Sequence, residues 1–473
     1  MNQQATSNDS DKRGVPMPRV FISAAHKSSG KTTLTLGLCA ALHARGHAVQ
    51  PFKKGPDYID PLWLGMAAQR PCYNLDFHMM QRSEIERQFA NTAAGARISL
   101  IEGNKGLYDG LDLDGSNSNA ALAKLLGAPV VLVIDARGMT RGVAPLILGY
   151  QAFDPDIHIA GVILNNLGGS RHESKLRAVI EHYTDVEVIG AVQHDASMQI
   201  AERHLGLVPA NEQQAALARI RHVGERVAAQ VDLDRLLVIA DSAPAREVMP
   251  AERSGTACPE RVRVAIAHDP AFGFYYSEDL DSLRSSNVEL VGLDTLHADT
   301  LPEVDGLIIG GGFPEVFMDE LEANVPLRAS IRTAIEAGLP TYAECGGLMY
   351  LSRRLSWKGR TCEMVGVVPG DTVMHERPVG RGYASLQPTG VDRWQESVRI
   401  PAHEFHYSSL ENLPADSIYA YRVKRGHGID GVHDGYQQYN LLAGYVHRRG
   451  SGEQGWIAPF LNQVRAHKAR AAA

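Results

Sequence analysis

The chain has 473 residues, of which 44% are hydrophobic and 21% are charged, so it has enough apolar material for two or three packed domains. This composition excludes a wholly disordered chain, a collagen-like chain and a small disulfide scaffold, and the formal net charge of −7 does not indicate a nucleic-acid coat or an anionic membrane surface as partner. Five cysteines without a CxxC pair, in a sequence without an apolar run of membrane-spanning length, predict a cytoplasmic protein.

The first half of the sequence alternates apolar runs with helical stretches. Residues 1–18 are polar, carry mixed charge and lack the apolar region of a secretory signal, so a flexible tail is expected there. Because parallel strands need crossover helices, the alternation after this tail predicts a parallel-sheet α/β domain over residues 19–240. Its strands are expected at residues 20–24, 47–52, 98–102, 130–135, 159–164 and 186–191.

A break in this pattern separates the two halves of the chain. Residues 241–260 contain three prolines and no clear periodicity, which is typical of an interdomain linker. The β/α alternation then restarts, and it predicts a second α/β domain over residues 261–473. From about Val365 onward, shorter strands with glycine turns are expected. The stronger strands of this domain are expected at residues 261–267, 288–293, 306–309 and 340–343.

A phosphate-binding loop is predicted at the start of the first helix. The residues of this loop are Gly30, Lys31, Thr32 and Thr33, and they stand between a strand and a helix. Backbone N–H groups and the helix dipole attract phosphate oxygens at such a position. Lys31 can neutralise the β- and γ-phosphates, and the Thr32 hydroxyl can ligate Mg²⁺. The first glycine of the usual loop pattern falls at Ala25, so the loop is a variant.

Acidic residues near strand ends are the candidate metal ligands of the first domain. Glu102 closes one expected strand and Asp57 follows another, and such positions face the ligand crevice of an open α/β sheet. Asp135, at the end of a third strand, is a further candidate. Each of these carboxylates can equally be a cap or turn residue. Lys53 and Lys54 form a cationic patch beside Asp57, which can bind phosphate or a substrate carboxylate or remain solvated.

A cysteine nucleophile is predicted in the second domain. Cys345 stands between the strand expected at 340–343 and a following helix, with glycines beside it, which is the pattern of a nucleophile elbow. The helix start favours the thiolate and offers N–H groups to an oxyanion. Gly346 at the elbow, and Gly311 and Gly312 in an upstream glycine-rich loop, are the candidates for an oxyanion hole.

A catalytic cysteine needs a histidine as base. His447 follows a late expected strand and is the first candidate. His403 and His406 are its rivals, and each of the three can equally be a structural histidine.

Ordered sequence segments from residue 19 to about residue 447 resemble one known family. Matches so numerous and in the same order exclude chance. The chain resembles the cobyrinate a,c-diamide synthase family of glutamine-dependent tetrapyrrole amidases. The matching segments are QPFKKGPDYIDP, NLDFHMM, IEGNKGLYDG, VVLVIDARGM, GVILNN, ERHLGLVPA, AFGFYY, GGGFPE, AECGGLMYL and HEFHYS.

This resemblance implies a dethiobiotin-synthetase-like first domain and a class I glutamine amidotransferase second domain. In such an enzyme Cys345 attacks the glutamine amide and releases ammonia, and His447 raises the nucleophilicity of the thiol. ATP with Mg²⁺ phosphorylates an acetate side chain of the macrocycle, and ammonia then displaces the phosphate to leave an amide. The implied partners are a tetrapyrrole carboxylate and L-glutamine, without nucleic acid or membrane. A homodimer is expected from the resemblance alone.

The resemblance also assigns residues to roles. Asn165, in the segment GVILNN, is expected to bind the nucleotide together with the phosphate-binding loop. Lys53, Tyr58 and Asp60, in the segment around GPDYIDP, are expected near the substrate. The expected Mg²⁺ ligands are Thr32, Asp57 and Glu102, which were singled out above by their positions at the helix start and near strand ends.

Some positions depart from the family pattern. Class I amidotransferases often carry a glutamate two residues after the catalytic histidine, but this chain has Arg449 there, so we expect a Cys–His pair without a conventional third member. A histidine expected shortly after GPDYIDP is replaced by the stretch 62–64, Leu-Trp-Leu. These departures favour a related branch that amidates sirohaem or sirohydrochlorin over the cobyrinate enzymes, with a nickel-sirohydrochlorin enzyme as a third option.

Other readings stay open at this point. A cobyric acid synthase-like amidase shares the two-domain logic, although GPDYIDP and NLDFHMM fit the diamide synthases better. A non-catalytic phosphate-loop ATPase scaffold would be favoured by loss of Cys345 or His447, and both are present. A ParA-like ATPase would carry a second loop lysine near position 26, which is His26 here.

Overall fold

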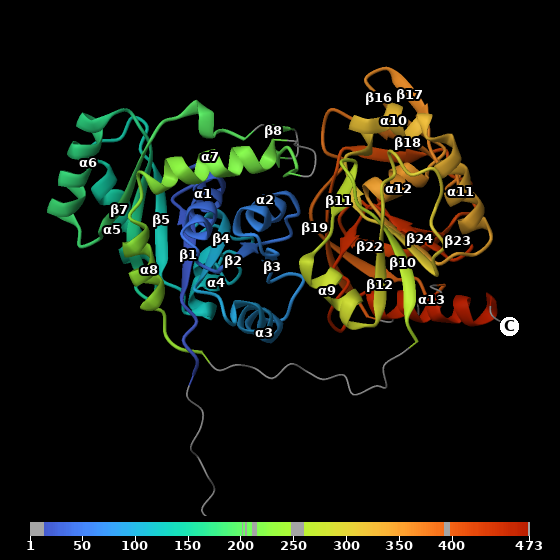
Figure 1. The fold of residues 1–473 in the computed structure, drawn as a ribbon, viewed down its shortest axis with the longest axis horizontal. Helices are drawn as coiled ribbons and strands as arrows, with labels where there is room; N and C mark the ends of the chain where they lie inside the picture. The colour runs from blue at the N-terminus through green and yellow to red at the C-terminus, as the bar shows by residue number, and fades with distance from the viewer. Residues whose placement is uncertain are drawn as a thin grey trace, which may run out of the picture. The chain divides into compact units, whose positions relative to one another are not determined.

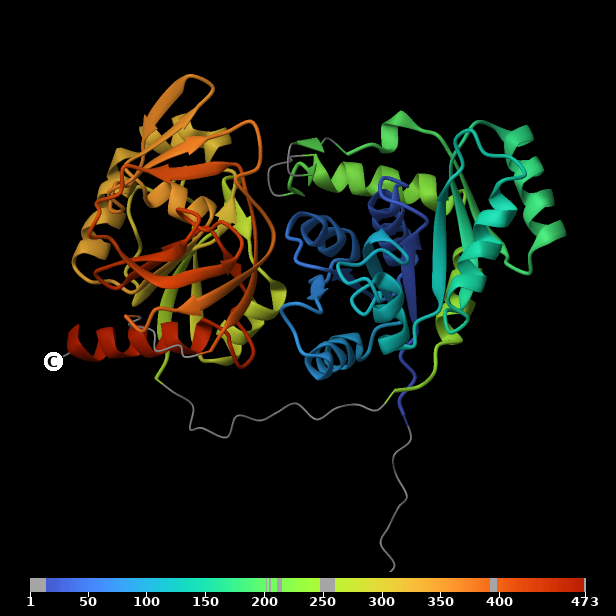
Figure 2. The same ribbon diagram turned by 180° about the vertical axis from the view of Figure 1, so that it is seen from behind.

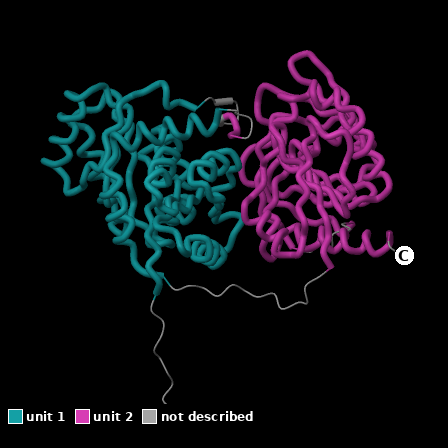
Figure 3. Tube along the Cα trace, in the orientation of Figure 1, with its two compact units in different colours: residues 1–202, 215–253 teal, residues 203–214, 254–473 magenta. Residues whose placement is uncertain are grey.

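The structure, a computed structural model, describes residues 14–200, 202–203, 206–210, 215–246, 260–391 and 398–471. The chain divides into two compact units (Figure 3), of which unit 1 contains residues 1–202 and 215–253 and unit 2 contains residues 203–214 and 254–473. Residues 247–259 of the expected linker lie outside the described residues, so the domain boundaries drawn from the sequence stay predictions. Among the described residues, no helix is long and apolar enough to cross a membrane.

A parallel sheet with helices on both faces forms the centre of unit 1 (Figures 1 and 2). Within the described residues it has seven strands in the order β3-β2-β4-β1-β5-β6-β7. Each neighbouring pair is parallel, so the predicted sheet with crossover helices is confirmed. The carboxyl ends of these strands lie at one edge of the sheet, which is where an open α/β sheet places its ligand.

The sheet and helices of unit 1 alternate along the chain. They are β1 (Arg19–Ala24), α1 (Lys31–Ala44), β2 (Val49–Lys54), α2 (Ile59–Ala68), β3 (Tyr73–Leu75), α3 (Arg82–Ala93), β4 (Ile98–Gly106), α4 (Asn119–Leu126), β5 (Val130–Asp135), α5 (Val143–Phe153), β6 (Ile159–Leu167), α6 (Ser170–Tyr183), β7 (Val188–Gln193), η1 (Ala196–Met198), α7 (Ala216–Ala228) and α8 (Leu233–Asp241). Two short strands, β8 (Glu202–Arg203) and β9 (Gly206–Leu207), pair with each other before α7.

Both faces of the central strands are buried, because helices cover each of them. Every residue of β1 and β5 is buried, which explains why these strands read as continuous apolar runs in the sequence. One face packs against helices α3 to α6, and Phe21 and Phe52 belong to that core. On the other face α1 lies against the sheet, and α7 packs across α1 (Figure 1).

The end of the expected tail is attached to unit 1. Residues 1–13 lie outside the described residues, but Val15 pairs with Arg246 and Met17 is buried in the core. The cause is Arg19, whose buried guanidinium donates hydrogen bonds to the carbonyls of Met17, Leu126 and Pro244. The last residues of the expected tail are therefore packed against unit 1, and the flexible tail over residues 1–18 stays a prediction. The Arg19 side chain binds the backbone carbonyl of Met17, and local sequence patterns do not predict such a contact.

A mixed sheet forms the centre of unit 2. Among the described residues it has ten strands in the order β12-β10-β13-β15-β24-β23-β22-β19-β20-β25. The strands from β12 to β24 in this order pair in parallel, and the remaining pairs are antiparallel. Smaller sheets formed by β11 with β14, and by β17-β16-β18-β21, lie beside it. The second predicted α/β domain is confirmed, and its short late strands extend the parallel sheet as antiparallel neighbours.

Apart from residues 203 and 206–207 of the short strands β8 and β9, which are assigned to unit 2, the elements of unit 2 begin after residue 260. They are β10 (Val262–Ala267), β11 (Phe272–Phe274), α9 (Ser277–Ser285), β12 (Val288–Leu293), β13 (Gly306–Ile309), β14 (Gly311–Gly312), η3 (Pro314–Phe317), α10 (Met318–Ala323), α11 (Val325–Glu336), β15 (Thr341–Glu344), α12 (Gly346–Leu351), β16 (Arg354–Trp357), β17 (Arg360–Glu363), β18 (Asp371–Met374), β19 (Gly380–Pro388), β20 (Ile400–His406), β21 (Ser408–Glu411), β22 (Ile418–Arg425), β23 (His433–Gln438), β24 (Leu441–Gly444), β25 (His447–Arg448) and α13 (Ile457–Ala471).

Candidate active sites

The loop between β1 and α1 has the local geometry that its sequence predicts. Gly30 caps α1 with a φ of +83°, a conformation that favours glycine. A Cβ atom at this position would lie 2.2 Å from Nδ2 of Asn165. The same Asn165 Nδ2 donates a hydrogen bond of 2.9 Å to the carbonyl of Ser29. Asn165, at the end of β6, therefore touches the phosphate-binding loop that lies two strands away.

Lys31 and Thr33, which belong to the predicted phosphate-binding loop, lie in the first turn of α1. The Lys31 side chain is buried, and burial lowers its pKa while the nearby Glu102 carboxylate partly opposes that change. Thr33 is half-buried in the first turn of the helix. A bound anion at the start of α1 would therefore stabilise the charged form of Lys31.

Thr32, Lys53, Asp60 and Glu102 converge beside the start of α1. The Thr32 hydroxyl donates to Oε1 of Glu102 at 2.7 Å and lies 3.3 Å from Oδ2 of Asp60. The Lys53 ammonium donates to Oε1 of Glu102 at 3.0 Å and contacts Asp60 still more closely. Asp57 is at the margin of this cluster, with Oδ2 3.8 Å from Lys53 Nζ. Residues from α1, β2, α2 and β4 therefore meet at the carboxyl edge of the sheet.

Burial perturbs the charges in this cluster. It raises the pKa of Glu102, although Lys53 opposes the shift, and burial together with Asp60 raises the pKa of Asp57 to about 7. Burial alone would lower the pKa of Lys53, but Asp60 and Glu102 hold that pKa well above its usual range. Perturbed carboxylates around one cation at a sheet edge are typical of a functional site.

The segment that carries Asp57, Tyr58 and Asp60 is fixed by hydrogen bonds. Nδ2 of Asn74 donates to the carbonyls of Gly55 and Asp57 at 2.8 and 2.7 Å. Oδ1 of Asp57 accepts from the N–H groups of residues 59 and 60 at the start of α2. Tyr58 is buried immediately before α2. Sequence reasoning missed Asn74, although it lies in the quoted segment NLDFHMM.

One observation supports a Mg²⁺ ion in this cluster. Oε2 of Glu102 is buried and has no hydrogen-bond partner among the described residues, so a carboxylate oxygen is left for a cation. The part of the chain that the structure describes holds no group of three or more His, Cys, Asp or Glu side chains arranged for a metal. Mg²⁺ does not need such a cage, because one or two carboxylates, waters and substrate phosphates usually hold it. Thr32, Asp57 and Glu102 stay the predicted ligands.

Two further candidates are not brought into this cluster. Asp135 forms an ion pair with Arg137, and its carboxylate also accepts from the Arg137 backbone N–H. Lys54 is buried apart from Lys53, because neighbouring residues of a strand point to opposite faces of the sheet. Burial lowers the pKa of Lys54 to about 8, while Asp76 opposes that shift. The two lysines therefore do not form the single cationic patch that the sequence predicted.

Cys345 sits at a strained turn between β15 and α12 in unit 2. Its φ of +48° and ψ of −103° are unusual for a residue with a side chain, which is the geometry of a nucleophile elbow. Its N–H donates to the carbonyl of Gly444 at 2.8 Å, and its carbonyl accepts from the N–H of Met349 at 3.0 Å. These bonds hold the strained residue in place. The thiol is largely buried, with 7% of the residue exposed.

His447 lies against Cys345. Burial alone would lower the pKa of His447, but a hydrogen bond and charge interaction with Cys345, and the carboxylate of Glu344, raise that pKa to about 10. Nδ1 of His447 lies 3.3 Å from Oε2 of Glu344. This arrangement favours an imidazolium ring beside the thiol.

The two rival histidines have other partners. His403 stacks on His447, with ring centroids 5.0 Å apart, and its Nδ1 is 3.3 Å from the Tyr276 hydroxyl. His406 stacks on Tyr445 at 4.1 Å. The Cys345 thiol raises the pKa of His447, which favours His447 over the other two histidines as the base.

The glycines of the predicted oxyanion hole surround this pair. A Cβ atom at Gly311 would lie 2.7 Å from Cε1 of His447. One at Gly346 would lie 3.0 Å from the backbone nitrogen of Gly312. A side chain at Gly312 would meet the carbonyl of Ala271 at 2.0 Å. Backbone thus approaches the Cys345 turn at a distance that only glycine permits.

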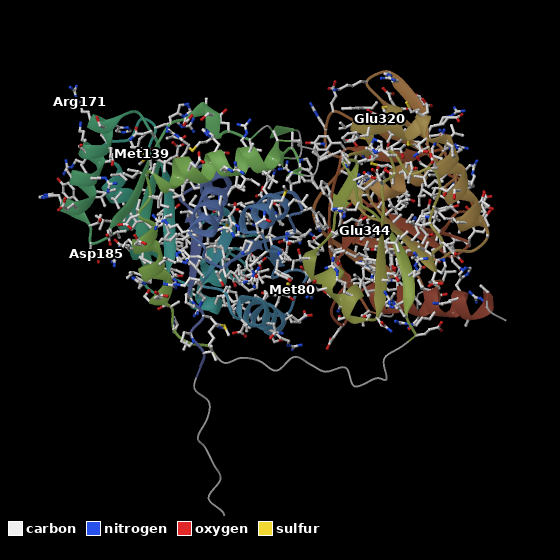
Figure 4. All side chains as sticks on the ribbon, viewed as in Figure 1. Met80, Met139, Arg171, Asp185, Glu320 and Glu344 are labelled. Atoms are coloured by element: carbon white, nitrogen blue, oxygen red, sulfur yellow. The ribbon has the colours of Figure 1, made fainter. Side chains whose placement is uncertain are left out.

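Arg449 stands where class I amidotransferases often carry a glutamate, two residues after His447. Arg449 lies 3.9 Å from the buried carboxylate of Glu278. The carboxylate next to His447 comes instead from Glu344, the residue before Cys345. Figure 4 labels Glu344 among the side chains of unit 2. Sequence reasoning missed Glu344. The available signal was its place beside the nucleophile in the segment AECGGLMYL.

Comparisons with known proteins agree with both units. Residues 21–208 match the family described as the CobQ/CobB/MinD/ParA nucleotide binding domain, and residues 263–453 match the CobB/CobQ-like glutamine amidotransferase domain. The chain is therefore a glutamine-dependent ligase with a nucleotide-binding domain.

Relatives over almost the whole length give the family. The chain is 48% identical to a cobyrinate a,c-diamide synthase of Magnetococcus marinus over 94% of this chain and 96% of that protein. It is 44% identical to one of Methanosarcina acetivorans, over 94% and 95%, and 41% identical to one of Archaeoglobus fulgidus, over 91% and 94%. The chain belongs to the cobyrinate a,c-diamide synthase family.

Proposed function

We propose that this protein amidates acetate carboxylates of a tetrapyrrole, with ATP to activate the carboxylate and glutamine to supply ammonia. The observation that carries this proposal is the presence of two complementary sites in one chain. Unit 1 holds a phosphate-binding loop beside a carboxylate and lysine cluster, and unit 2 holds a Cys–His pair at a nucleophile elbow. The names of the relatives support cobyrinate as the tetrapyrrole.

The reaction needs an activated carboxylate, because ammonia does not displace an oxide ion from a carboxylate at a useful rate. Transfer of the γ-phosphoryl group of ATP to the acetate oxygen gives an acyl phosphate, from which phosphate can leave. Lys31 and the N–H groups at the start of α1 bind the phosphates, and Asn165 holds the loop. Mg²⁺, held by Thr32, Asp57 and Glu102, supplies positive charge to the phosphates when bound. Lys53 neutralises the carboxylates that gather beside it.

Glutamine hydrolysis is assigned to unit 2. The thiolate of Cys345 forms a bond to the amide carbon, and His447 gives its proton to the nitrogen as the C–N bond breaks, so ammonia leaves and a thioester remains. His447 then takes a proton from water as the water oxygen attacks the thioester. The C–S bond breaks, glutamate leaves, and its new carboxyl group loses a proton to solvent. The thiolate and the imidazolium are thereby restored.

The sirohaem or sirohydrochlorin branch is the second candidate, and it rests on the departures from the family pattern. The burial of those residues weakens its support. Trp63 and Leu64 are fully buried, and Arg449 lies in unit 2 against Glu278. Such positions serve packing or glutamine hydrolysis rather than an exposed surface for the macrocycle. A scaffold without catalysis is disfavoured because Cys345 occupies a strained strand-to-helix turn and raises the pKa of His447.

A mass-spectrometric assay tests the proposal. Purified protein with ATP, Mg²⁺ and glutamine is incubated with cobyrinic acid, sirohydrochlorin and sirohaem in parallel. We expect cobyrinic acid to gain two amides and the other two macrocycles to stay unchanged. Amidation of sirohydrochlorin or sirohaem alone would overturn the choice of substrate. No amidation of any macrocycle would overturn the function.

A further inference from the structure

We propose that Glu344 is the residue that positions His447 for glutamine hydrolysis, and that it replaces the missing carboxylate two residues after the histidine. This inference rests on the proposed roles of Cys345 and His447. It adds the group that sets the orientation and the charge of the histidine ring. Nucleophile and positioning carboxylate are then consecutive residues at the end of β15.

The Glu344 carboxylate is held in one orientation. Its Oε1 accepts hydrogen bonds from the Tyr342 hydroxyl and, at 2.9 Å, from the backbone N–H of Arg448. The Tyr342 ring is itself fixed, because it stacks on Trp456 with centroids 3.9 Å apart. Oε2 faces Nδ1 of His447 at 3.3 Å. Since 8% of the Glu344 side chain is exposed, water competes little for these contacts.

This geometry selects one form of the histidine. A carboxylate accepts hydrogen bonds only, so Nδ1 of His447 carries a proton and donates it toward Glu344. The other ring nitrogen is then left for Cys345, whose thiol raises the pKa of His447. The negative charge of Glu344 further stabilises the imidazolium that pairs with the thiolate. Its contact therefore serves both the acid and the base step of the reaction.

Other buried carboxylates of unit 2 have different partners. Glu278 lies against Arg449. Asp279 accepts from the N–H groups of Gly450 and the following serine. Glu404 accepts from backbone N–H groups at residues 427 and 428. The Tyr342 hydroxyl and the Arg448 backbone N–H contact Glu344, and His403 stacks on His447. Cys345 affects the pKa of His447, and Glu344 affects the pKa values of Tyr275 and Asp279.

The variant E344Q tests this role, because it removes the charge and keeps the shape. Glutaminase activity is measured as glutamate formed, across pH, in the full-length protein. We expect kcat to fall at least about 100-fold with little change in KM, since the amide can present an N–H to Nδ1 and select the wrong tautomer. We also expect the alkaline limb of the kcat/KM profile, where His447 loses its proton, to move to lower pH. A residue that only packs would not move that limb.

Matched variants keep the test decisive. E344D keeps the charge with a shorter reach and should recover part of the lost kcat and the wild-type alkaline limb. Y342F removes one hydrogen bond to Glu344 but no charge, so it should cost less than E344Q. E344Q with a kcat within about threefold of wild type and an unmoved pH profile would overturn the proposal. If E344Q is unstable, E344D decides the question instead. An E344D protein whose alkaline limb moves to lower pH, although the carboxylate charge is kept, would overturn the proposal.

The same preparations separate this inference from the proposed function. Amidation with ammonium salts in place of glutamine reports on unit 1 alone. Wild-type protein that hydrolyses glutamine but amidates no tetrapyrrole would leave the role of Glu344 intact and refute the function. A Cys345→Ser variant that keeps glutaminase activity would refute the Cys–His assignment, and the role of Glu344 with it.

Discussion

The hydroxyl of Thr32 donates a 2.7 Å hydrogen bond to Oε1 of Glu102, which joins the start of α1 to the middle of β4. The two residues are 70 positions apart in the sequence. They meet because β1 and β4 are neighbouring parallel strands in which Ile22 lies beside Glu102. The second oxygen of Glu102 is left without a hydrogen-bond partner among the described residues, next to the loop that is proposed to hold phosphate.

This contact predicts the effect of Glu102→Gln. Loss of the carboxylate charge removes a ligand for Mg²⁺ and a partner of Lys53, so amidation should fall at least about 100-fold with either glutamine or ammonium salts. Glutaminase activity should be retained. Asp135→Asn is the matched control, because Asp135 pairs with Arg137 instead. Equal losses in the two variants would contradict the assignment of Glu102, and tetrapyrrole products followed by mass spectrometry give the measurement.

Cys345→Ser separates the two nitrogen sources. A serine hydroxyl is a far weaker nucleophile than a thiolate beside an imidazolium, so glutamine-dependent amidation should be lost. Amidation with ammonium salts should remain, because the phosphate-binding loop is untouched. Turnover is measured with each nitrogen source in the same preparation. Continued use of glutamine would show that Cys345 is not the nucleophile.

Much of the fold follows from local sequence patterns. The strands expected at 130–135 and 288–293 have the bounds of β5 and β12. Strand β5 is buried throughout, so its apolar run has no other environment to occupy. The predicted phosphate-binding loop and the elbow at Cys345 have the expected strand–turn–helix settings for the same reason, because these elements are adjacent in the chain.

Contacts between distant residues were not predictable in this way. Glu344 meets His447 across 103 positions, through strands whose neighbours are set by the order of the sheet. Asn74 holds the Asp57 segment from a short strand that carries little pattern of its own. Asn165 was placed near the nucleotide by resemblance alone. Such residues become visible only when the topology brings two strand ends together.

Gly30→Ala tests whether the tight approach of Asn165 matters. Gly46 offers a matched control, since both glycines have a φ of +83° but a Cβ at Gly46 would meet nothing within 4 Å. Alanine at either site should cost about 1–2 kcal/mol from the backbone conformation. At Gly30 the added Cβ also displaces Asn165, so ATP should bind at least about tenfold more weakly. Calorimetric titration with ATP and thermal unfolding separate the two effects, and equal ATP affinity in both variants would contradict the prediction.

Asp434 should make the stability of unit 2 depend on pH. Burial raises its pKa from 3.8 to about 7, although N–H groups of Tyr445 and Val446 oppose that shift. A raised pKa in the folded state means that the group stabilises the fold below pH 4 and that this contribution is lost as the pH rises to about 7. From pH 5 to pH 8 the loss should be about 3 kcal/mol.

The variant Asp434→Asn isolates this contribution. An uncharged amide has no proton to lose, so the variant should keep more of its free energy of unfolding than wild type when the pH rises from 5 to 8. Denaturant unfolding of both proteins at each pH gives the difference, in which the contributions of other groups cancel. The N–H groups of Tyr445 and Val446 bind different oxygens of Asp434, so the single amide oxygen of asparagine keeps one of these two hydrogen bonds. The variant therefore starts from a lower stability, and only the change between pH 5 and pH 8 is compared. Both residues precede His447, so glutaminase activity at pH 8 reports whether the turn is intact. Parallel pH dependence in the two proteins would mean that Asp434 is ionised in the folded state without cost.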